Sequence, residues 1–237
     1  MKARPRAGQG RRLALALAYS ALTAFPCFAQ SQPPTQADMG LLRAEFWADT
    51  EPVAALGEEW PVSPGLARSR ILEEAAWVFG GMIWGFEFSY TPYDKTRAIE
   101  ERFDIAAIES LPADAPSLAR GARASNGQEY RSYVEYRPDA GMVRLMEDYA
   151  RGPWKSAQGT GRAGMGLGVK GRREACKDAL RAAVRSLLQG LEPNKPRLAR
   201  GRVVLDRPPG LAIVGGFYTA QVRARVMVVE VVPYTVY

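Results

Sequence analysis

The chain has 237 residues, two cysteines and no histidine, and its 32 basic and 25 acidic residues give a formal net charge of +7. The absence of histidine excludes Ser-His-Asp and Cys-His catalysis, histidine general bases and histidine-ligated zinc. We therefore expect no cofactor and no metal site. Any catalysis would depend on carboxylates, tyrosine, lysine or cysteine.

The N-terminal residues 1–29 have the pattern of a secretory signal peptide. Five basic residues precede the apolar run 13–25, and Cys27-Phe28-Ala29 offers small residues at the positions that determine cleavage. The run is shorter than the ~20 residues of a membrane span, and no later segment is long and uncharged enough. We expect cleavage near Ala29 and a periplasmic or secreted mature chain without a transmembrane span.

Two consequences follow from removal of the signal peptide. The mature chain keeps 27 basic and 25 acidic residues, a net charge of +2, so nothing predicts the concentrated basic face that binds nucleic acid. Cys176 remains as a single cysteine, which excludes an intramolecular disulfide. Lipidation at Cys27 is the alternative to simple cleavage, but Pro26 stands where a lipoprotein signal normally has a small residue.

The mature chain is expected to begin with a flexible leader, residues 30–62, and to continue as one α+β domain, residues 63–237. Within the leader, residues 39–47 carry a short amphipathic pattern that predicts a docking helix. The long connection 104–128 is either a surface loop or a boundary between two subdomains.

The most apolar window, residues 71–93, predicts a helix followed by a strand. The helix is expected to start at Ser63-Pro64 and to run to about Phe79, with a break at Gly80-Gly81. The second half alternates with period two and predicts a strand. One face of this strand would carry the aromatic residues Trp84, Phe86, Phe88 and Tyr90.

These aromatic residues allow two interpretations, and so does Glu87 on the opposite face. The favoured interpretation places the rings in the core and pairs an exposed Glu87 with a basic side chain. In the alternative, the rings form a stacking platform for a sugar, and a covered Glu87 with a raised pKa acts as a general acid. That alternative is a carboxylate-based hydrolase of an envelope glycan, with a second carboxylate about 5–9.5 Å from Glu87.

The middle of the chain is expected to mix helices and strands. Residues 94–103 predict a second helix, and residues 105–108 predict a short strand. Residues 130–137 and 142–149 predict a hairpin around the turn sequence 138–141.

The glycine-rich stretch 159–171 contains a G-x-G-x-x-G pattern at Gly159, Gly161 and Gly164, which also occurs in dinucleotide-binding loops. No β-branched strand precedes it. The favoured interpretation is a strand, with glycines at 164, 166 and 168 on a small face that lets the following helix lie close. That helix, residues 172–189, carries Cys176 on its apolar stripe, so the thiol is predicted to lie in the core.

The last fifth of the chain predicts at least three strands, at residues 202–205, 211–214 and 217–232. The last of them alternates apolar and polar side chains, as a half-buried antiparallel strand does. Helices and strands come in blocks. The sequence therefore predicts an α+β fold with a mainly antiparallel sheet and two or three helices packed on one face.

Residues 159–228 resemble the domain shared by LPP20-type lipoproteins and the N-terminal part of flagellar assembly protein T. The resemblance depends on a glycine-bearing strand, an alanine-rich helix at 175–183 and a G-x-Y-x-A-x-V pattern at 216–222. It implies an envelope module without catalytic residues. We therefore predict an exported, non-enzymatic cell-envelope protein that binds a protein, a glycan or a small ligand. The partner and the oligomeric state stay open.

Overall fold

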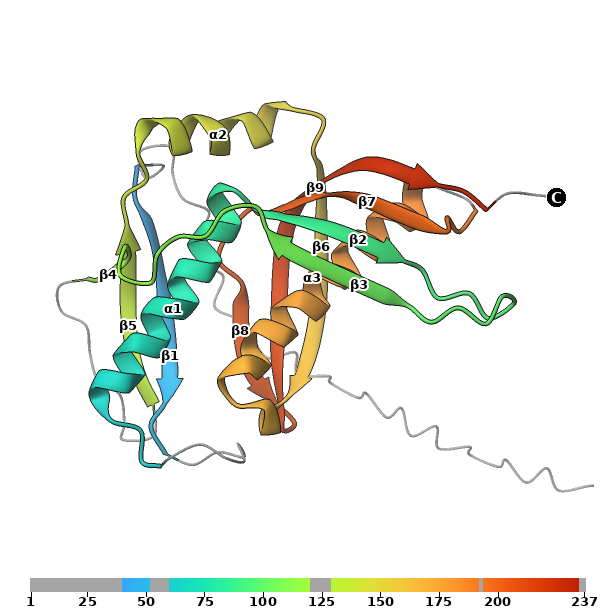
Figure 1. The fold of residues 1–237 in the computed structure, drawn as a ribbon. Coiled ribbons are helices and arrows are strands. Elements are labelled where there is room, and N and C mark those ends of the chain that lie inside the picture. The colour runs from blue at the N-terminus through green and yellow to red at the C-terminus, as the bar shows by residue number, and fades with distance from the viewer. Residues whose placement is uncertain (1–39, 52–59, 120–128, 192–193, 235–237) are drawn as a thin grey trace, which may run out of the picture. The chain divides into compact units, whose positions relative to one another are not determined.

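A computed structural model describes residues 40–51, 60–119, 129–191 and 194–234 of the chain (Figure 1). The predicted signal peptide, with Cys27, and the first residues of the predicted leader lie outside this part.

The described residues form three helices and two antiparallel sheets, which confirms the predicted α+β class (Figure 1). The helices are α1 (Pro64–Ile83), α2 (Ala140–Arg151) and α3 (Val169–Leu191), and a short 3-10 turn, η2 (Met165–Leu167), precedes α3. The small sheet has the order β1 (Leu42–Asp49), β5 (Glu129–Tyr136), β4 (Ser117–Leu118). The large sheet has the order β3 (Arg102–Ala107), β2 (Phe86–Thr91), β7 (Leu198–Leu205), β9 (Phe217–Val232), β6 (Lys155–Gly164), and β8 (Gly210–Val214) also pairs with β9.

Helix α1 starts where the sequence predicts but continues beyond the expected break. The Ser63 side chain accepts a hydrogen bond from the Leu66 amide, with Pro64 in the first turn, as predicted. The helix then passes through the glycine pair and ends at Ile83. The missing side chain at Gly81 leaves room for the Phe86 ring, which lies only 2.7 Å from where a Cβ would be. The turn into β2 comes at Gly85, whose φ of +76° favours glycine.

The segment predicted as a second helix, residues 94–103, instead forms the turn and second strand of a hairpin. Asp94 and Ile99 form an isolated bridge, and the Asp94 carboxylate accepts from the Thr96 amide at 3.0 Å. Strand β3 then places Phe103 opposite Tyr90. Cross-strand pairing of aromatic side chains therefore outweighs the weak helical spacing of this segment.

In two further segments helix and strand are exchanged: one predicted strand is a helix, and one predicted helix is a strand. Residues 142–149, predicted as a strand, lie in α2, because the Asp139 side chain accepts from the Met142 amide at 2.9 Å and caps a helix. The predicted docking helix at 39–47 is instead strand β1, which pairs with β5 over eight residues.

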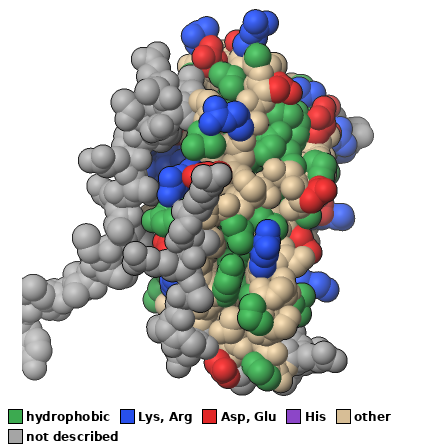
Figure 2. Space-filling model, turned by 90° about the vertical axis from the view of Figure 1, so that its left-hand side faces the viewer, with side chains coloured by type: hydrophobic (Ala, Val, Ile, Leu, Met, Phe, Trp, Pro, Cys, Tyr) green, Lys and Arg blue, Asp and Glu red, His purple; other side chains and the backbone are tan. Residues whose placement is uncertain are grey.

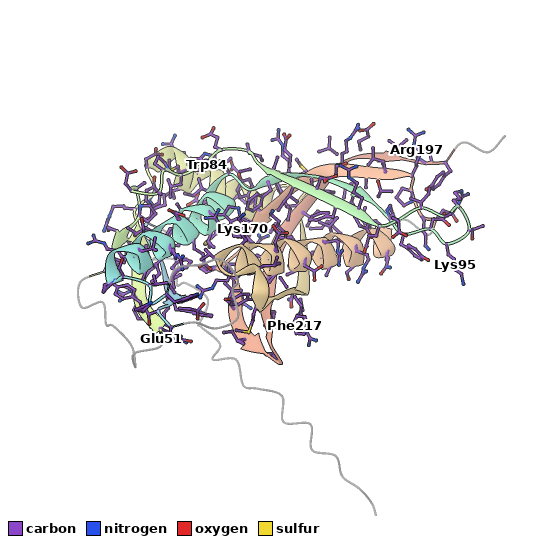
Figure 3. All side chains as sticks on the ribbon, turned by 60° about the horizontal axis from the view of Figure 1, so that its bottom comes forward. Glu51, Trp84, Lys95, Lys170, Arg197 and Phe217 are labelled. Atoms are coloured by element: carbon purple, nitrogen blue, oxygen red, sulfur yellow. The ribbon has the colours of Figure 1, made fainter. Side chains whose placement is uncertain are left out.

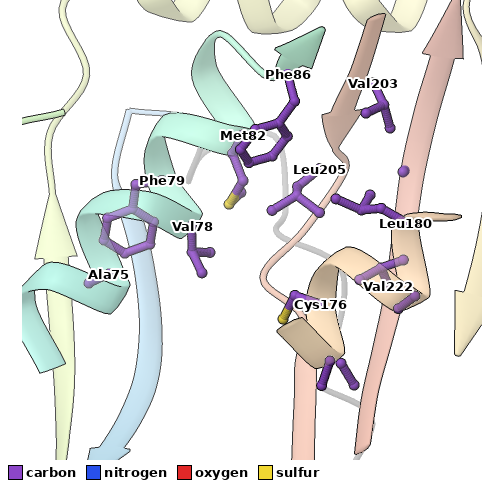
Figure 4. Packing of buried hydrophobic residues seen from close by; sticks show 14 of the residues in the cluster. Ala75, Val78, Phe79, Met82, Phe86, Cys176, Leu180, Val203, Leu205 and Val222 are labelled. Atoms are coloured by element: carbon purple, nitrogen blue, oxygen red, sulfur yellow. The ribbon is translucent and has the colours of Figure 1, made fainter. Parts of the chain in front are cut away.

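The core lies where α1, α3 and the large sheet meet (Figure 4). Helix α3 packs on β6 and β9, whereas α1 contacts β1 and β5 of the small sheet and β7 of the large sheet. Buried residues of the two helices face those of β2, β7 and β9; among them are Val78, Phe79, Leu180, Val203 and Val222. Helix α1 therefore connects the two sheets.

Candidate functional site

The aromatic residues that the sequence singles out lie mostly in the core. Phe86, Phe88 and Tyr90 on β2 are 1%, 3% and 2% exposed, and Trp84 is half-buried at the end of α1. Phe86 packs against the Trp77 ring, at 5.1 Å between ring centroids. Because these faces contact other core side chains, they offer no open platform to a sugar ring.

Glu87 lies on the opposite face of β2 and points away from this core. Its side chain is 64% exposed, and its carboxylate lies 3.8 Å from the Arg202 guanidinium on β7. This is the geometry of an exposed strand glutamate paired across strands, and such a pair contributes little to stability. The environment is not that of a desolvated general acid.

The first two glycines of the G-x-G-x-x-G pattern serve the packing of α3 on β6. A Cβ at Gly161 would lie 2.5 Å from the carbonyl oxygen of Ala175 and closer still to the Ala179 amide nitrogen. Gly159 is equally close to the helix backbone, whereas nothing lies within 4 Å of a Cβ at Gly164. The small face of β6 is therefore formed by Gly159 and Gly161, not by the glycines at 164–168. Because α3 covers this backbone, a nucleotide pyrophosphate has no access to it.

A buried ion cluster joins the two sheets, and no sequence pattern identified it. It consists of Asp49 on β1, Glu74 on α1, Arg172 on α3 and Tyr218 on β9. The Arg172 guanidinium lies 3.1 Å from the Asp49 carboxylate and 3.2 Å from that of Glu74. The Tyr218 hydroxyl donates to Asp49 at 3.2 Å. Four elements that are distant in the sequence thus meet at one guanidinium.

Strand β1 supplies further contacts to this cation through Trp47. The Arg172 guanidinium lies over the Trp47 ring, 3.6 Å from its centroid, and donates a hydrogen bond to the Trp47 carbonyl oxygen. Its side chain is only 5% exposed. A buried arginine is stable only when carboxylates, carbonyls and aromatic faces replace its water.

Burial controls the protonation of the groups around Arg172. It raises the pKa of Glu74 above its ordinary value of 4.5, although the Arg172 charge opposes this shift. Burial, together with the charge of Asp49, raises the pKa of Tyr218 to about 12. Burial also raises the pKa of the nearby Cys176 thiol, so this cysteine stays protonated and unreactive. The ion cluster therefore has a structural role, since it holds the small sheet and the large sheet together.

The raised pKa of Glu74 predicts a pH dependence of stability. The folded protein keeps this proton to a higher pH than the unfolded chain, so the contribution of Glu74 to stability falls as the pH rises above about 4.5. We expect the difference in unfolding free energy, wild type minus Glu74→Gln, to decrease with pH in urea titrations. A difference that increases with pH would mean that pairing with Arg172 outweighs burial.

A second surface that the sequence did not reveal is the apolar tip, which we define as Leu167, Ile213, Val214 and Phe217. These side chains are 54%, 39%, 38% and 47% exposed. Strand pairing places Phe217 between Val214 on β8 and Gly164 on β6, and Leu167 follows in η2. Figure 1 shows these strand ends at the same end of the large sheet, and Figure 3 labels Phe217 at the end of the hairpin.

The face on the side of β5 and α1 has a different character. Figure 2 shows basic and acidic side chains of both signs scattered there among hydrophobic ones. Exposed apolar residues that occur singly are ordinary on a protein surface, whereas a group of them on adjacent loops indicates an interaction site. The apolar tip is therefore the candidate binding site.

The fold defines an α+β protein with a buried ion cluster and an apolar tip. Among the described residues, no group of three or more cysteine, aspartate or glutamate side chains could hold a metal ion, and none of the helices in this part is long and apolar enough to cross a membrane.

A protein-family model matches residues 28–234 of the chain. The chain is also 30% identical to an uncharacterized protein of Treponema pallidum (strain Nichols), over 193 aligned residues that cover 81% of each chain. The chain belongs to this family. No solved structure matches it. The resemblance of residues 159–228 to LPP20-type lipoproteins is not shown by these comparisons and stays a prediction.

Proposed function

We propose that the protein is an exported, non-enzymatic component of the cell envelope that acts by binding a partner through the apolar tip. The observation that carries this proposal is the exposure, from 38% to 54%, of four apolar side chains on the β8–β9 hairpin and on η2. Water contact at such a group is unfavourable, and a partner that covers it gains the free energy of apolar burial.

The proposed location is supported by the sequence. Residues 1–29 combine a basic start, a short apolar run and small residues before Gln30, and this combination is typical of an exported protein. The predicted resemblance of residues 159–228 to envelope lipoproteins supports the same compartment. On this proposal, cleavage near Ala29 releases the mature chain into the periplasm or the medium.

Binding is favoured over hydrolysis by the surroundings of the sequence-predicted acid. Glu87 is solvated and paired with Arg202, and the neighbouring rings Phe86 and Phe88 are buried on the other face of β2. The buried carboxylates of Asp49 and Glu74 are both held by Arg172. Neither arrangement places an acid and a second carboxylate beside an open cleft.

Photo-crosslinking in the cells that express the protein tests this proposal. A photoreactive phenylalanine analogue at Phe217 should give a discrete adduct, because this residue lies at the centre of the apolar tip. The same analogue at Val229, which is 67% exposed elsewhere on β9, is the matched control and should give none. Cell fractionation and N-terminal sequencing should find the chain outside the cytoplasm, beginning at Gln30. A cytoplasmic chain with residues 1–29 intact, or equal adducts at both positions, would contradict the proposal.

A further inference from the structure

The segments that build the apolar tip carry charge of one sign. Residues 155–173 and 207–229 contain no aspartate or glutamate. Their basic residues are Lys155, Arg162, Lys170, Arg172, Arg173, Arg207, Arg223 and Arg225. Arg172 is buried in the ion cluster, whereas Arg162 and Lys170 are exposed. Neither of these two side chains forms an ion pair with another described residue. Their charges are therefore available to an external anion.

Strand pairing places one of these cations beside the central ring of the tip. Phe217 is directly opposite Gly164 on β6, and Arg162 lies two residues before Gly164 on the same strand. Because side chains two apart on a strand point to the same face, Arg162 lies on the face of Phe217 and diagonal to it. Lys170 follows Leu167 by three residues, at the start of α3 (Figure 3).

We infer that the apolar tip docks on the surface of an anionic lipid bilayer, an inference that rests on the proposed binding function of the tip. Phe217, Val214 and Leu167 enter the boundary between headgroups and acyl chains. Arg162 and Lys170 lie at headgroup level and contact lipid phosphates. An exposed apolar group beside cations is the arrangement that binds reversibly to such a surface, since apolar burial and electrostatic attraction act together.

The shape and charge of the site favour a bilayer over a protein groove. The tip is the end of a hairpin that turns at Gly215 and Gly216, with φ of +59° and +78°, so small residues bring Val214 and Phe217 to its extremity. Residues 155–173 and 207–229 contain no acidic residue that would repel anionic lipid. Asp178 on α3, which accepts a hydrogen bond from the Arg162 amide at 2.9 Å, is itself paired with Arg181. A protein partner normally meets a mixed polar rim around an apolar centre.

Vesicle flotation tests the inference with the exported, processed protein, whose N-terminus is read by mass spectrometry. We expect binding to phosphatidylcholine vesicles that contain phosphatidylglycerol, weaker binding at high salt, and little binding to phosphatidylcholine alone. Arg162→Gln and Lys170→Gln should each lower the partition coefficient about fivefold, and about 25-fold together. The Phe217→Ser/Leu167→Ser variant should lower it at least about tenfold. If some of the protein retained the apolar run 13–25, that run would increase the membrane binding of all variants equally. The test therefore compares the partition coefficients of the variants with one another.

Val229→Ser is the matched control, because it removes an exposed apolar side chain twelve residues, about 40 Å, farther along β9. Its partition coefficient should equal that of the wild type. Equal binding of the tip variants and the control, or no preference for phosphatidylglycerol, would overturn the inference. Arg162→Gln and Lys170→Gln change only exposed side chains and should leave the fold intact. They therefore test the bilayer inference even if the Phe217→Ser/Leu167→Ser variant unfolds.

Two other occupants of the tip give distinct results. If sedimentation shows a dimer that the Phe217→Ser/Leu167→Ser variant loses, the occupant is a second copy of the chain and the bilayer inference is wrong. If photo-crosslinking at Phe217 captures one protein while no vesicle binds, the proposed function stands and the inference alone fails. If Phe217 gives no adduct and no vesicle binds, both fail.

Discussion

Replacement of Arg172 by methionine is expected to lower the free energy of unfolding by about 3–5 kcal/mol. The variant leaves the carboxylates of Asp49 and Glu74 buried without the cation that both contact. It also removes the hydrogen bond to the Trp47 carbonyl and the contact with the Trp47 ring. Urea denaturation followed by circular dichroism measures the loss.

The neighbouring residue provides the matched control for this experiment. Arg173 donates to the Glu73 carbonyl oxygen at 3.2 Å in an exposed position, so Arg173→Met should change stability by less than about 1 kcal/mol. The triple variant Arg172→Met/Asp49→Asn/Glu74→Gln should recover part of the lost stability, because no buried charge remains. Equal effects of the two single variants would show that the ion cluster does not hold the sheets together.

The second large effect is expected at the contact between β6 and α3. Gly161→Ala should lower the free energy of unfolding by at least about 3 kcal/mol, the upper part of the range for overpacked cores. The added methyl would lie 2.5 Å from the Ala175 carbonyl oxygen and closer to the Ala179 amide. Both are backbone atoms of α3, so no side-chain rotation relieves the clash and the helix must move off the sheet.

Gly164→Ala is the control on the same strand. Nothing lies within 4 Å of a Cβ there, and the φ of −64° suits alanine, so stability should change by less than about 0.5 kcal/mol. The same urea titration compares the two variants. A mild effect at Gly161 would mean that the helix can lie farther from the strand at little cost.

Apolar patterns that continue over many residues, at helical or alternating spacing, predicted their elements well. The stripe that includes Cys176 and Leu180 marks α3, and the alternation of Tyr218, Ala220 and Val222 marks β9. Short segments were predicted less well. Residues 42–49 and 142–149 each fit more than one period, and the outcome depended on a distant partner, β5, in one case and on the Asp139 cap in the other.

Of the two candidate sites, the ion cluster had a signal in the sequence and the apolar tip had none. Glu73 and Glu74 are adjacent on α1, and adjacent helical side chains diverge, so Glu74 points inward to Arg172 while Glu73 is exposed. One signal did exist, since Arg172 lies four residues before Cys176 and thus on the apolar stripe of α3. The exposure of the apolar tip had no comparable signal. It depends on how far the hairpin around Gly215 extends beyond its neighbours, and only the assembled sheet determines that length.

The position of β1 has a consequence for the order in which the protein folds. This strand pairs with β5, about 90 residues later, and is held by Arg172 and Tyr218, which are 123 and 169 residues from Asp49. Contacts at such separations close large loops and form slowly. Among the described strands, the one nearest the N-terminus therefore completes its contacts only when the C-terminal strand β9 is present. Until then, β1 is unpaired and open to chaperones.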